Sequence, residues 1–120
     1  MMGRLRSLVS AAALRHAADA YLAACFARET PPRASELAGN LEVSAHHLSR
    51  TFRERIGMPL SRYLKNGQLA YAKHLLRTTG RSMNEIAYAA GFGTRITFFR
   101  AFRQATGVTP TQYREMKNIK

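Results

Sequence analysis

Two segments, 44–56 and 94–105, each carry apolar residues with a helical period. The apolar stripe consists of Leu48, Phe52 and Ile56 in the first segment, and of Phe98, Phe102 and, less regularly, Ala105 in the second. This spacing predicts two helices that each bury one face. The other face of each helix is left for a partner.

Two longer segments also favour helix. Residues 60–77 contain no proline and carry an amphipathic pattern formed by Leu60, Tyr63, Leu64, Leu69, Ala72, Leu75 and Leu76. About 18 residues at roughly 1.5 Å each give a rod of about 27 Å. Residues 11–28 form an Ala-rich helical segment that ends at Glu29-Thr30-Pro31-Pro32, and we expect it to pack across the first repeat described next.

The chain repeats one pattern after about 50 residues. The matching pairs are Glu36-Leu37-Ala38 with Glu85-Ile86-Ala87, Arg50-Thr51-Phe52-Arg53 with Arg100-Ala101-Phe102-Arg103, Gly57 with Gly107, Pro59 with Pro110, and Tyr63 with Tyr113. The second copy has one extra residue between Phe92 and Thr94, which a loop absorbs. Each copy has the order short helix, turn, longer helix and stop, which is the order of a helix-turn-helix.

Local signals agree with these boundaries. Ser82-Met83-Asn84-Glu85 has the sequence of a capping box, and Thr109-Pro110 supplies a cap followed by proline at the first helical position. The remaining signals are the N-caps Ser44 and Thr94 and the helix-ending glycines Gly57 and Gly107.

The fold expected is all-α: one domain over residues 1–120, with seven helices and two helix-turn-helix subdomains joined by a long connecting helix. Its parts are 11–57, the first helix-turn-helix with its N-terminal helix; 60–77, the connecting helix; 82–107, the second helix-turn-helix; and 110–117, a C-terminal helix. A connecting helix of about 27 Å can hold the second helices of the two repeats at a separation near the helical repeat of B-DNA, roughly 34 Å. One chain can therefore fill two successive segments of the major groove.

Composition points to a polyanionic partner. The chain has 120 residues, 19 Lys or Arg against 7 Asp or Glu, and a net charge of +12 with 46% hydrophobic residues, which describes a folded basic domain. Between residues 41 and 103 there are 11 Lys or Arg and 3 Asp or Glu, a net of +8. The lone Cys25 lies on an apolar helix face, where burial explains it.

The N-terminus superficially resembles a secretory leader, with basic residues at Arg4 and Arg6 before a short apolar stretch at 8–14. Arg15, His16 and Asp19 then interrupt it, and no run approaches the roughly 18 apolar residues of a membrane span. We therefore expect a cytoplasmic protein without a membrane partner.

The candidate contact residues lie on the faces opposite the apolar stripes. They are His46, Ser49, Arg50 and Arg53 in the first helix, and Arg95, Ile96, Thr97, Arg100 and Arg103 in the second. Arg50 and Arg100 are suited to two-pronged contacts with guanine; an ion pair or a phosphate contact is the alternative for each. Candidate phosphate contacts are Arg53, Arg62, Lys65, Arg81 and Arg103, any of which could equally be a solvated charge.

Other functional classes find less support. The sequence has no Gly-rich phosphate loop and no paired metal-ligand motif, and the adjacent His46 and His47 cannot face the same way on a helix, so we expect no enzyme, no metal and no cofactor. Neither the aromatic platform nor the Gly-x-x-Gly clamp of RNA-binding domains is found. A membrane-surface helix over residues 1–26 lacks a strongly basic face, and a protein-interaction module is the main rival to DNA binding.

The chain closely resembles the DNA-binding domain of the AraC/XylS family of bacterial transcription regulators over roughly residues 15–115. The residues that carry the resemblance are Glu36-Leu37-Ala38, 44–52, Gly57-Met58-Pro59, Tyr63-Leu64, Leu75-Leu76, Glu85-Ile86-Ala87, Gly91-Phe92, Phe98, Arg100, Phe102, Gly107, Pro110 and Tyr113-Arg114. The chain departs from the family at Gln68, where arginine is frequent, at Phe99, where a small polar residue is usual, and at Gly93, where an acidic or polar residue is common.

The resemblance implies a sequence-specific regulator that binds double-stranded DNA through recognition helices at about 44–56 and 94–105. It implies contacts to bases or flanking phosphates by His46, Ser49, Arg50, Arg95, Ile96, Thr97 and Arg100, with apolar contact to thymine methyl groups as one role for Ile96 and Phe99. RNA polymerase is a further candidate partner. Most members carry an effector or dimerisation domain that this chain has no room for, so we expect either a small single-domain member or the C-terminal fragment of a longer regulator.

Overall fold

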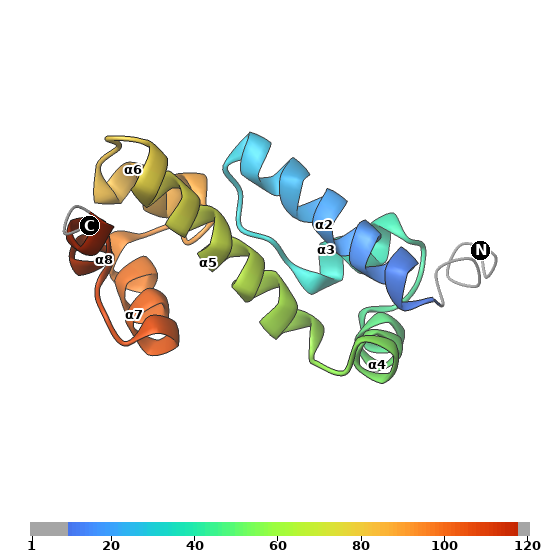
Figure 1. The fold of residues 1–120 in the computed structure, drawn as a ribbon. Helices are drawn as coiled ribbons and strands as arrows, with labels where there is room; N and C mark the ends of the chain where they lie inside the picture. The colour runs from blue at the N-terminus through green and yellow to red at the C-terminus, as the bar shows by residue number, and fades with distance from the viewer. Residues whose placement is uncertain (1–9, 118–120) are drawn as a thin grey trace. The chain divides into compact units, whose positions relative to one another are not determined.

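The computed structural model describes residues 10–117 and is all-helical over that range (Figure 1). Residues 1–9, which include most of the leader-like segment, and residues 118–120 lie outside the described residues. Within the described range the seven helices are α2 (Ala11–Arg28), α3 (Ala34–Asn40), α4 (Ala45–Ile56), α5 (Leu60–Thr78), α6 (Met83–Ala89), α7 (Arg95–Thr106) and α8 (Pro110–Lys117). The all-α class and the seven helices expected from the sequence are confirmed.

Contacts divide the chain into two compact units, and helices α2 and α5 supply residues to both. Unit 1 comprises the described residues up to Ala24 together with Pro32–Asn66, and unit 2 comprises Cys25–Pro31 and the described residues from Gly67 onward. Unit 1 therefore contains the helix pair α3 and α4, and unit 2 contains α6, α7 and α8.

Unit 1 closes its first helix-turn-helix around a small apolar core. The buried side chains are Leu14, Ala18, Tyr21, Leu22, Leu37, Ala38, Leu41, Leu48, Phe52, Leu60 and Leu64. Phe52 of α4 meets Tyr63 of α5 edge to face, with ring centroids 5.2 Å apart. One face of α4 is thereby held inside, which leaves the opposite face to solvent.

The start of α3 uses a hydroxyl from α2 in place of an ordinary cap. Its N-cap residue, Arg33, makes no side-chain cap hydrogen bond. Instead the Arg33 backbone N–H donates to the Tyr21 hydroxyl (2.8 Å), which in turn donates to Oε1 of Glu36 (2.6 Å). The equivalent positions of the second repeat, Ser82 and Glu85, form a direct capping box. The Tyr21 hydroxyl thus bridges the N-cap residue and the glutamate in unit 1, whereas the equivalent residues bond to each other directly in unit 2.

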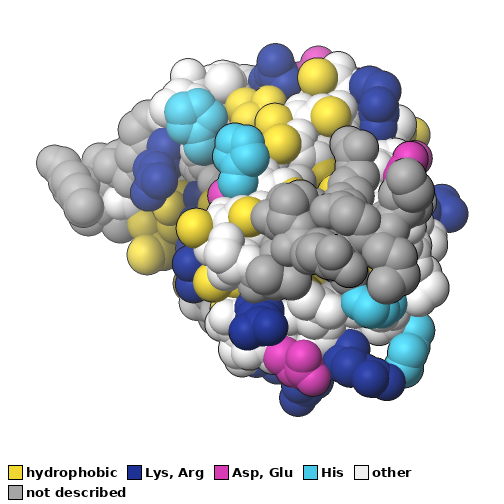
Figure 2. Space-filling model, turned by 90° about the vertical axis from the view of Figure 1, so that its right-hand side faces the viewer, with side chains coloured by type: hydrophobic (Ala, Val, Ile, Leu, Met, Phe, Trp, Pro, Cys, Tyr) yellow, Lys and Arg dark blue, Asp and Glu magenta, His cyan; other side chains and the backbone are white. Residues whose placement is uncertain are grey.

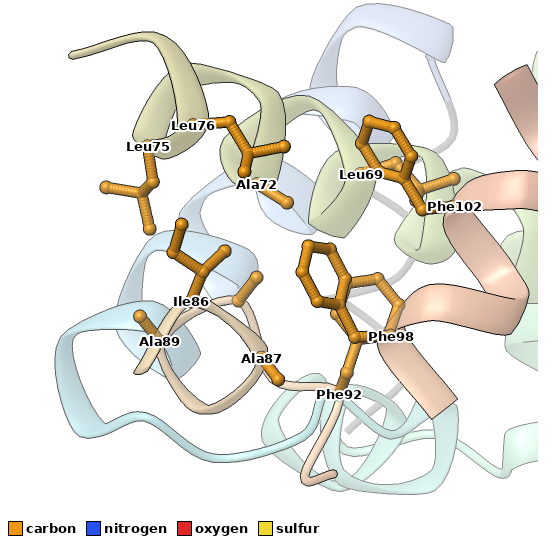
Figure 3. Packing of buried hydrophobic residues seen from close by; sticks show 11 residues of the cluster. Leu69, Ala72, Leu75, Leu76, Ile86, Ala87, Ala89, Phe92, Phe98 and Phe102 are labelled. Carbon is orange, nitrogen blue, oxygen red and sulfur yellow. The ribbon is translucent and has the colours of Figure 1, made fainter. Parts of the chain in front are cut away.

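Unit 2 packs α5, α6 and α7 around an apolar core that contains three phenylalanines (Figure 3). Phe98 and Phe102 of α7 are fully buried, with ring centroids 5.8 Å apart, and Phe98 also packs against Phe92, which follows α6. Phe102 meets Tyr113 at 5.3 Å and 72°, the counterpart of the Phe52–Tyr63 contact.

Gln68 is the polar residue of α5 that enters the unit 2 core. Only 8% of its surface is exposed, and its Nε2 donates to the backbone carbonyl of Ala90 at 3.0 Å. Ala90 is the C-cap residue of α6. The departure from the family noted at this position therefore has a structural role, because the amide satisfies a carbonyl at the end of a helix.

The expected helix ends are confirmed at both repeats. The side chains of Ser44 and Thr94 cap α4 and α7 by accepting from the backbone N–H three residues later. Gly57 and Gly107 end these helices in the left-handed conformation, with φ of 92° and 85°. The cap predicted at Thr109 also forms, since its hydroxyl accepts from the Gln112 N–H at 3.1 Å.

The apolar stripe predicted for α7 is wrong at its last position. Ala105 is exposed, and the half-buried Thr106 occupies the place that matches Ile56 of α4. The Thr106 hydroxyl donates to the Phe102 carbonyl (2.8 Å), which lets a polar side chain close the stripe. A spacing of four residues from Phe102 leads to position 106. The sequence pattern did not indicate Thr106 because its side chain is polar, but its hydroxyl forms a hydrogen bond within the helix.

Candidate nucleic-acid interface

The outer face of α4 brings together the four residues predicted for it. His46, Ser49, Arg50 and Arg53 are all exposed, whereas Leu48 and Phe52 on the opposite face are buried. Nη2 of Arg50 donates to Nε2 of His46 at 3.3 Å across one helical turn. The contact holds the guanidinium beside the N-terminal half of the helix.

These side chains line a shallow hollow of about 300 Å³ in unit 1. Its walls are formed by Ala34, His46, Ser49, Arg50, Arg53, Pro59, Leu60 and Ser61. The hollow therefore lies between the outer face of α4 and the start of α5. Ser61 is a hydroxyl donor at this surface that the sequence interpretation did not single out.

The outer face of α7 is also basic, but it differs from that of α4. Arg95, Ile96, Thr97, Arg100 and Arg103 are exposed, as predicted from the pattern. Arg100 and Arg103 line a hollow of about 410 Å³ together with Phe99, Gln104 and Thr109. The equivalent arginine pairs of the two repeats thus line equivalent hollows in their own units, and Gln104 is a lining residue that the sequence interpretation missed.

Phe99 lines this hollow and also packs within unit 2. It is half-buried, meets Phe98 edge to face at 5.8 Å, and carries the guanidinium of Arg95 over its ring at 5.0 Å. A guanidinium over an aromatic face is attracted by the ring's quadrupole, whose face is negative and edge positive. Phe99 therefore supports Arg95. The sequence feature that indicates this role is an aromatic residue four positions after an arginine on the same helix.

The remaining predicted phosphate contacts are exposed but lie outside these two hollows. Arg62 and Lys65 are exposed on α5. Arg81 precedes α6 and shares a separate hollow with Glu29, Glu85 and Tyr88. Two carboxylates beside Arg81 weaken the attraction of this site for an anion, which sets it apart from the faces of α4 and α7.

The electrostatics of the two outer faces favour an anion. Helix α7 contains no acidic residue, and neither α4 nor α7 has one in its first turn. Figure 2 shows one side of the molecule, where Lys and Arg side chains are more frequent than Asp and Glu, in keeping with the net charge of +12. Positive side chains combined with helix N-termini attract phosphate.

Tyr63 is a titratable group whose surroundings shift its pKa. Burial raises the pKa of its hydroxyl, and the hydrogen bond to Asp19 (2.9 Å) and the charge of that carboxylate act in the same direction, while Arg15 lowers the pKa. The bond joins α2 to α5 within unit 1. Tyr63 is therefore a packing residue with a polar anchor, as expected.

No group of three or more His, Cys, Asp or Glu side chains in residues 10–117 is placed to hold a metal ion. No helix in that range is long and apolar enough to cross a membrane.

Comparison with protein families matches the chain to a helix-turn-helix domain over residues 37–116. A relative named HTH-type transcriptional regulator Rv1931c, from Mycobacterium tuberculosis, is 34% identical over 83 residues, which cover 69% of this chain and 32% of the relative. The chain spans about a third or less of the length of the curated relatives it matches.

Solved structures show the same architecture. The C-terminal domain of AraT, a response regulator from Geobacillus stearothermophilus, is 31% identical, with a TM-score of 0.77 and coverage of 86% of this chain and 84% of that one. A transcriptional regulator with an AraC-type DNA-binding domain from Chromobacterium violaceum is 26% identical, with a TM-score of 0.71 and coverage of 98% and 96%. The AdpA DNA-binding domain, solved with a target DNA, shares the fold at 23% identity, with a TM-score of 0.74 and coverage of 85% and 93%. The matched family model, together with two basic helix-turn-helix repeats in the expected order, shows that the chain belongs to the AraC-type helix-turn-helix family.

Proposed function

We propose that the chain is a sequence-specific DNA-binding module of a transcription regulator, which inserts α4 and α7 into successive segments of the major groove. The observation that carries the proposal is the equivalence of two exposed basic faces, each with two arginines one turn apart beside a hollow and each backed by buried apolar side chains. A related fold, the AdpA domain, has been solved with its target DNA.

Arg50 and Arg100 are the proposed guanine contacts. Both are exposed at equivalent places in the two repeats, and a guanidinium can donate two hydrogen bonds to O6 and N7 of guanine in the major groove. The hydrogen bond from Arg50 to His46 limits the directions that this side chain takes, which favours one register on the duplex. His46, Ser49, Arg95, Ile96 and Thr97 complete the proposed base-contacting set.

Arg53 and Arg103 are the proposed phosphate contacts nearest to the recognition residues. Each follows the guanine-contacting arginine by three residues, so it lies one turn further along the same helix, in the same hollow. Arg62, Lys65 and Arg81 add salt-dependent affinity without reading sequence. Among these Arg81 contributes least, because Glu29 and Glu85 share its hollow.

In vitro selection from a random duplex library, followed by gel-shift titration with the selected site, tests the proposal. We expect Arg50→Ala and Arg100→Ala each to relax base preference in a different part of the site, with a loss of about 1–3 kcal/mol of discrimination. Arg53→Ala should weaken all duplexes alike and reduce the salt slope by about 1. Arg15→Ala, which removes one charge from α2 outside both faces, is the matched control and should leave base preference intact.

Two results would contradict the proposal. A chain that selects no sequence and gives no shift that survives nonspecific competitor DNA would be a protein-interaction module, the main rival. Unchanged base preferences in both Arg50→Ala and Arg100→Ala would instead refute the guanine contacts while leaving DNA binding in place.

We further propose that the module acts within a longer regulator. This proposal is supported by the length of the curated relatives, because the chain spans about a third or less of each. Such a regulator works at the bacterial chromosome in the cytoplasm, with RNA polymerase as a second partner, and the module itself carries no catalytic step. Bacterial two-hybrid assays of the chain against polymerase subunits test this partner.

A further inference from the structure

Ile96 is an apolar side chain that packing does not explain. It is 70% exposed in the first turn of α7, while its neighbour two positions along, Phe98, is fully buried. Its counterpart in the first repeat is the polar His46. In the free chain this large aliphatic side chain stays in water, so a partner that covers it gains the free energy of burying its surface.

The neighbours of Ile96 restrict what that partner is. Arg100 lies one turn further along α7 on the same outer face, and both side chains are exposed. Phe99, the other apolar candidate on this helix, already has partners, because it packs on Phe98 and supports the Arg95 guanidinium. Ile96 is therefore the exposed aliphatic group beside the arginine proposed to contact guanine.

We propose that Ile96 is a specificity-determining residue that packs against the 5-methyl group of a thymine next to the base contacted by Arg100. This inference rests on the proposed function and concerns the base chemistry of one half of the site. In the major groove thymine presents a methyl group, whereas cytosine and adenine present an amino donor and guanine two acceptors. An isoleucine side chain leaves such polar edges unpaired, so it favours the methyl-bearing base.

The two halves of the operator differ accordingly. In the first repeat, His46 is polar and accepts a hydrogen bond from Arg50, so this pair recognises its half-site without a methyl contact. In the second repeat, Ile96 cannot bond to Arg100 and supplies apolar surface instead. The half-site read by α7 should therefore contain a thymine that the half-site read by α4 does not require.

Replacement of single thymines by deoxyuridine in the selected duplex tests this inference, because the change removes only the methyl group. We expect one sensitive thymine in the half-site whose base preference is relaxed by Arg100→Ala. Removal of its methyl group should lower affinity about fourfold, which corresponds to the burial of one methyl group. Ile96→Ala should bind the thymine and uracil duplexes equally. Ile96→Val and Ile96→Thr form a matched pair of nearly equal shape, and only the valine variant should keep the preference for thymine.

The outcomes separate this inference from the proposed function. Binding with no sensitivity to deoxyuridine in that half-site, or equal sensitivity in wild type and Ile96→Ala, would overturn the methyl contact and leave DNA binding standing. Absence of sequence-dependent binding by the wild type would overturn the proposed function itself. His46→Ala should leave the sensitivity of the second half-site to deoxyuridine unchanged. Loss of that sensitivity would show that the methyl contact belongs to the first repeat and not to Ile96.

Discussion

The buried amide of Gln68 allows a quantitative test of how unit 2 is held together. Replacement of Gln68 by methionine keeps the length of the side chain but removes the hydrogen bond to the Ala90 carbonyl. An acceptor that loses its donor inside a protein costs about 1–3 kcal/mol, and the apolar sulfur and methyl group recover part of that by burial. We therefore expect a loss of about 1–2 kcal/mol, which lowers the midpoint of thermal unfolding by about 4–8 °C.

Gln68→Glu sharpens the test, because a carboxyl group donates to the carbonyl only when it is protonated. Burial raises the pKa of an introduced carboxyl group above its unfolded value of about 4.3. The variant should therefore be close to wild type below about pH 4 and lose stability as the pH rises through the folded-state pKa. Gln68→Met should show a loss that does not depend on pH in this way.

Circular dichroism at 222 nm during heating and during urea titration measures both effects. Asn66→Met, an exposed position on the same helix, is the matched control and should change the midpoint by less than about 2 °C. If Gln68→Met matched this control, the hydrogen bond to Ala90 would contribute nothing, and the account of Gln68 as a structural residue would be refuted.

Three further changes have defined outcomes. Glu29 ends α2 with φ of 54°, so Glu29→Gly should stabilise the fold by about 0.5–1 kcal/mol in urea unfolding, and Glu29→Ala, which keeps the strain, should not. Because the folded-state pKa of Tyr63 lies above its unfolded value, its stabilising contribution is complete below about pH 10 and is lost at higher pH; the stability difference between wild type and Tyr63→Phe should shrink over that range. Operators should carry half-sites about 10 base pairs apart, and insertion of about 5 base pairs should lower affinity at least about tenfold in gel shifts.

Repeated spacing in the sequence predicted much of the candidate interface. Helix caps at Ser44, Thr94 and Ser82 and the stops at Gly57 and Gly107 are local signals, since each depends on a few neighbouring residues, and all formed as expected. The exposure of Arg50 and its equivalent in α7 followed from the same periodicity. The separation of the two recognition helices on DNA stays a prediction.

Contacts between distant segments were beyond the sequence pattern. Tyr21 lies 12 residues before Arg33, and nothing in the local pattern indicated that its hydroxyl would complete the cap of α3. Gln68 and Ala90 are 22 residues apart, so the sequence alone did not indicate which group the Gln68 side chain would bond to. The sequence makes Phe99 a candidate for apolar contact with a base, and it does not predict the packing of this ring on Phe98.

The sequence by itself determined the helices, their caps and the two basic faces, because hydrophobic period and capping act over one or two turns of chain. Only the tertiary structure decided which polar groups are satisfied from another helix and how far Phe99 is buried. Phe99 is half-buried against Phe98 whereas Ile96 stays exposed, since burial depends on which helices meet. That difference between two apolar residues of α7 underlies the reading role proposed for Ile96 and the supporting role of Phe99.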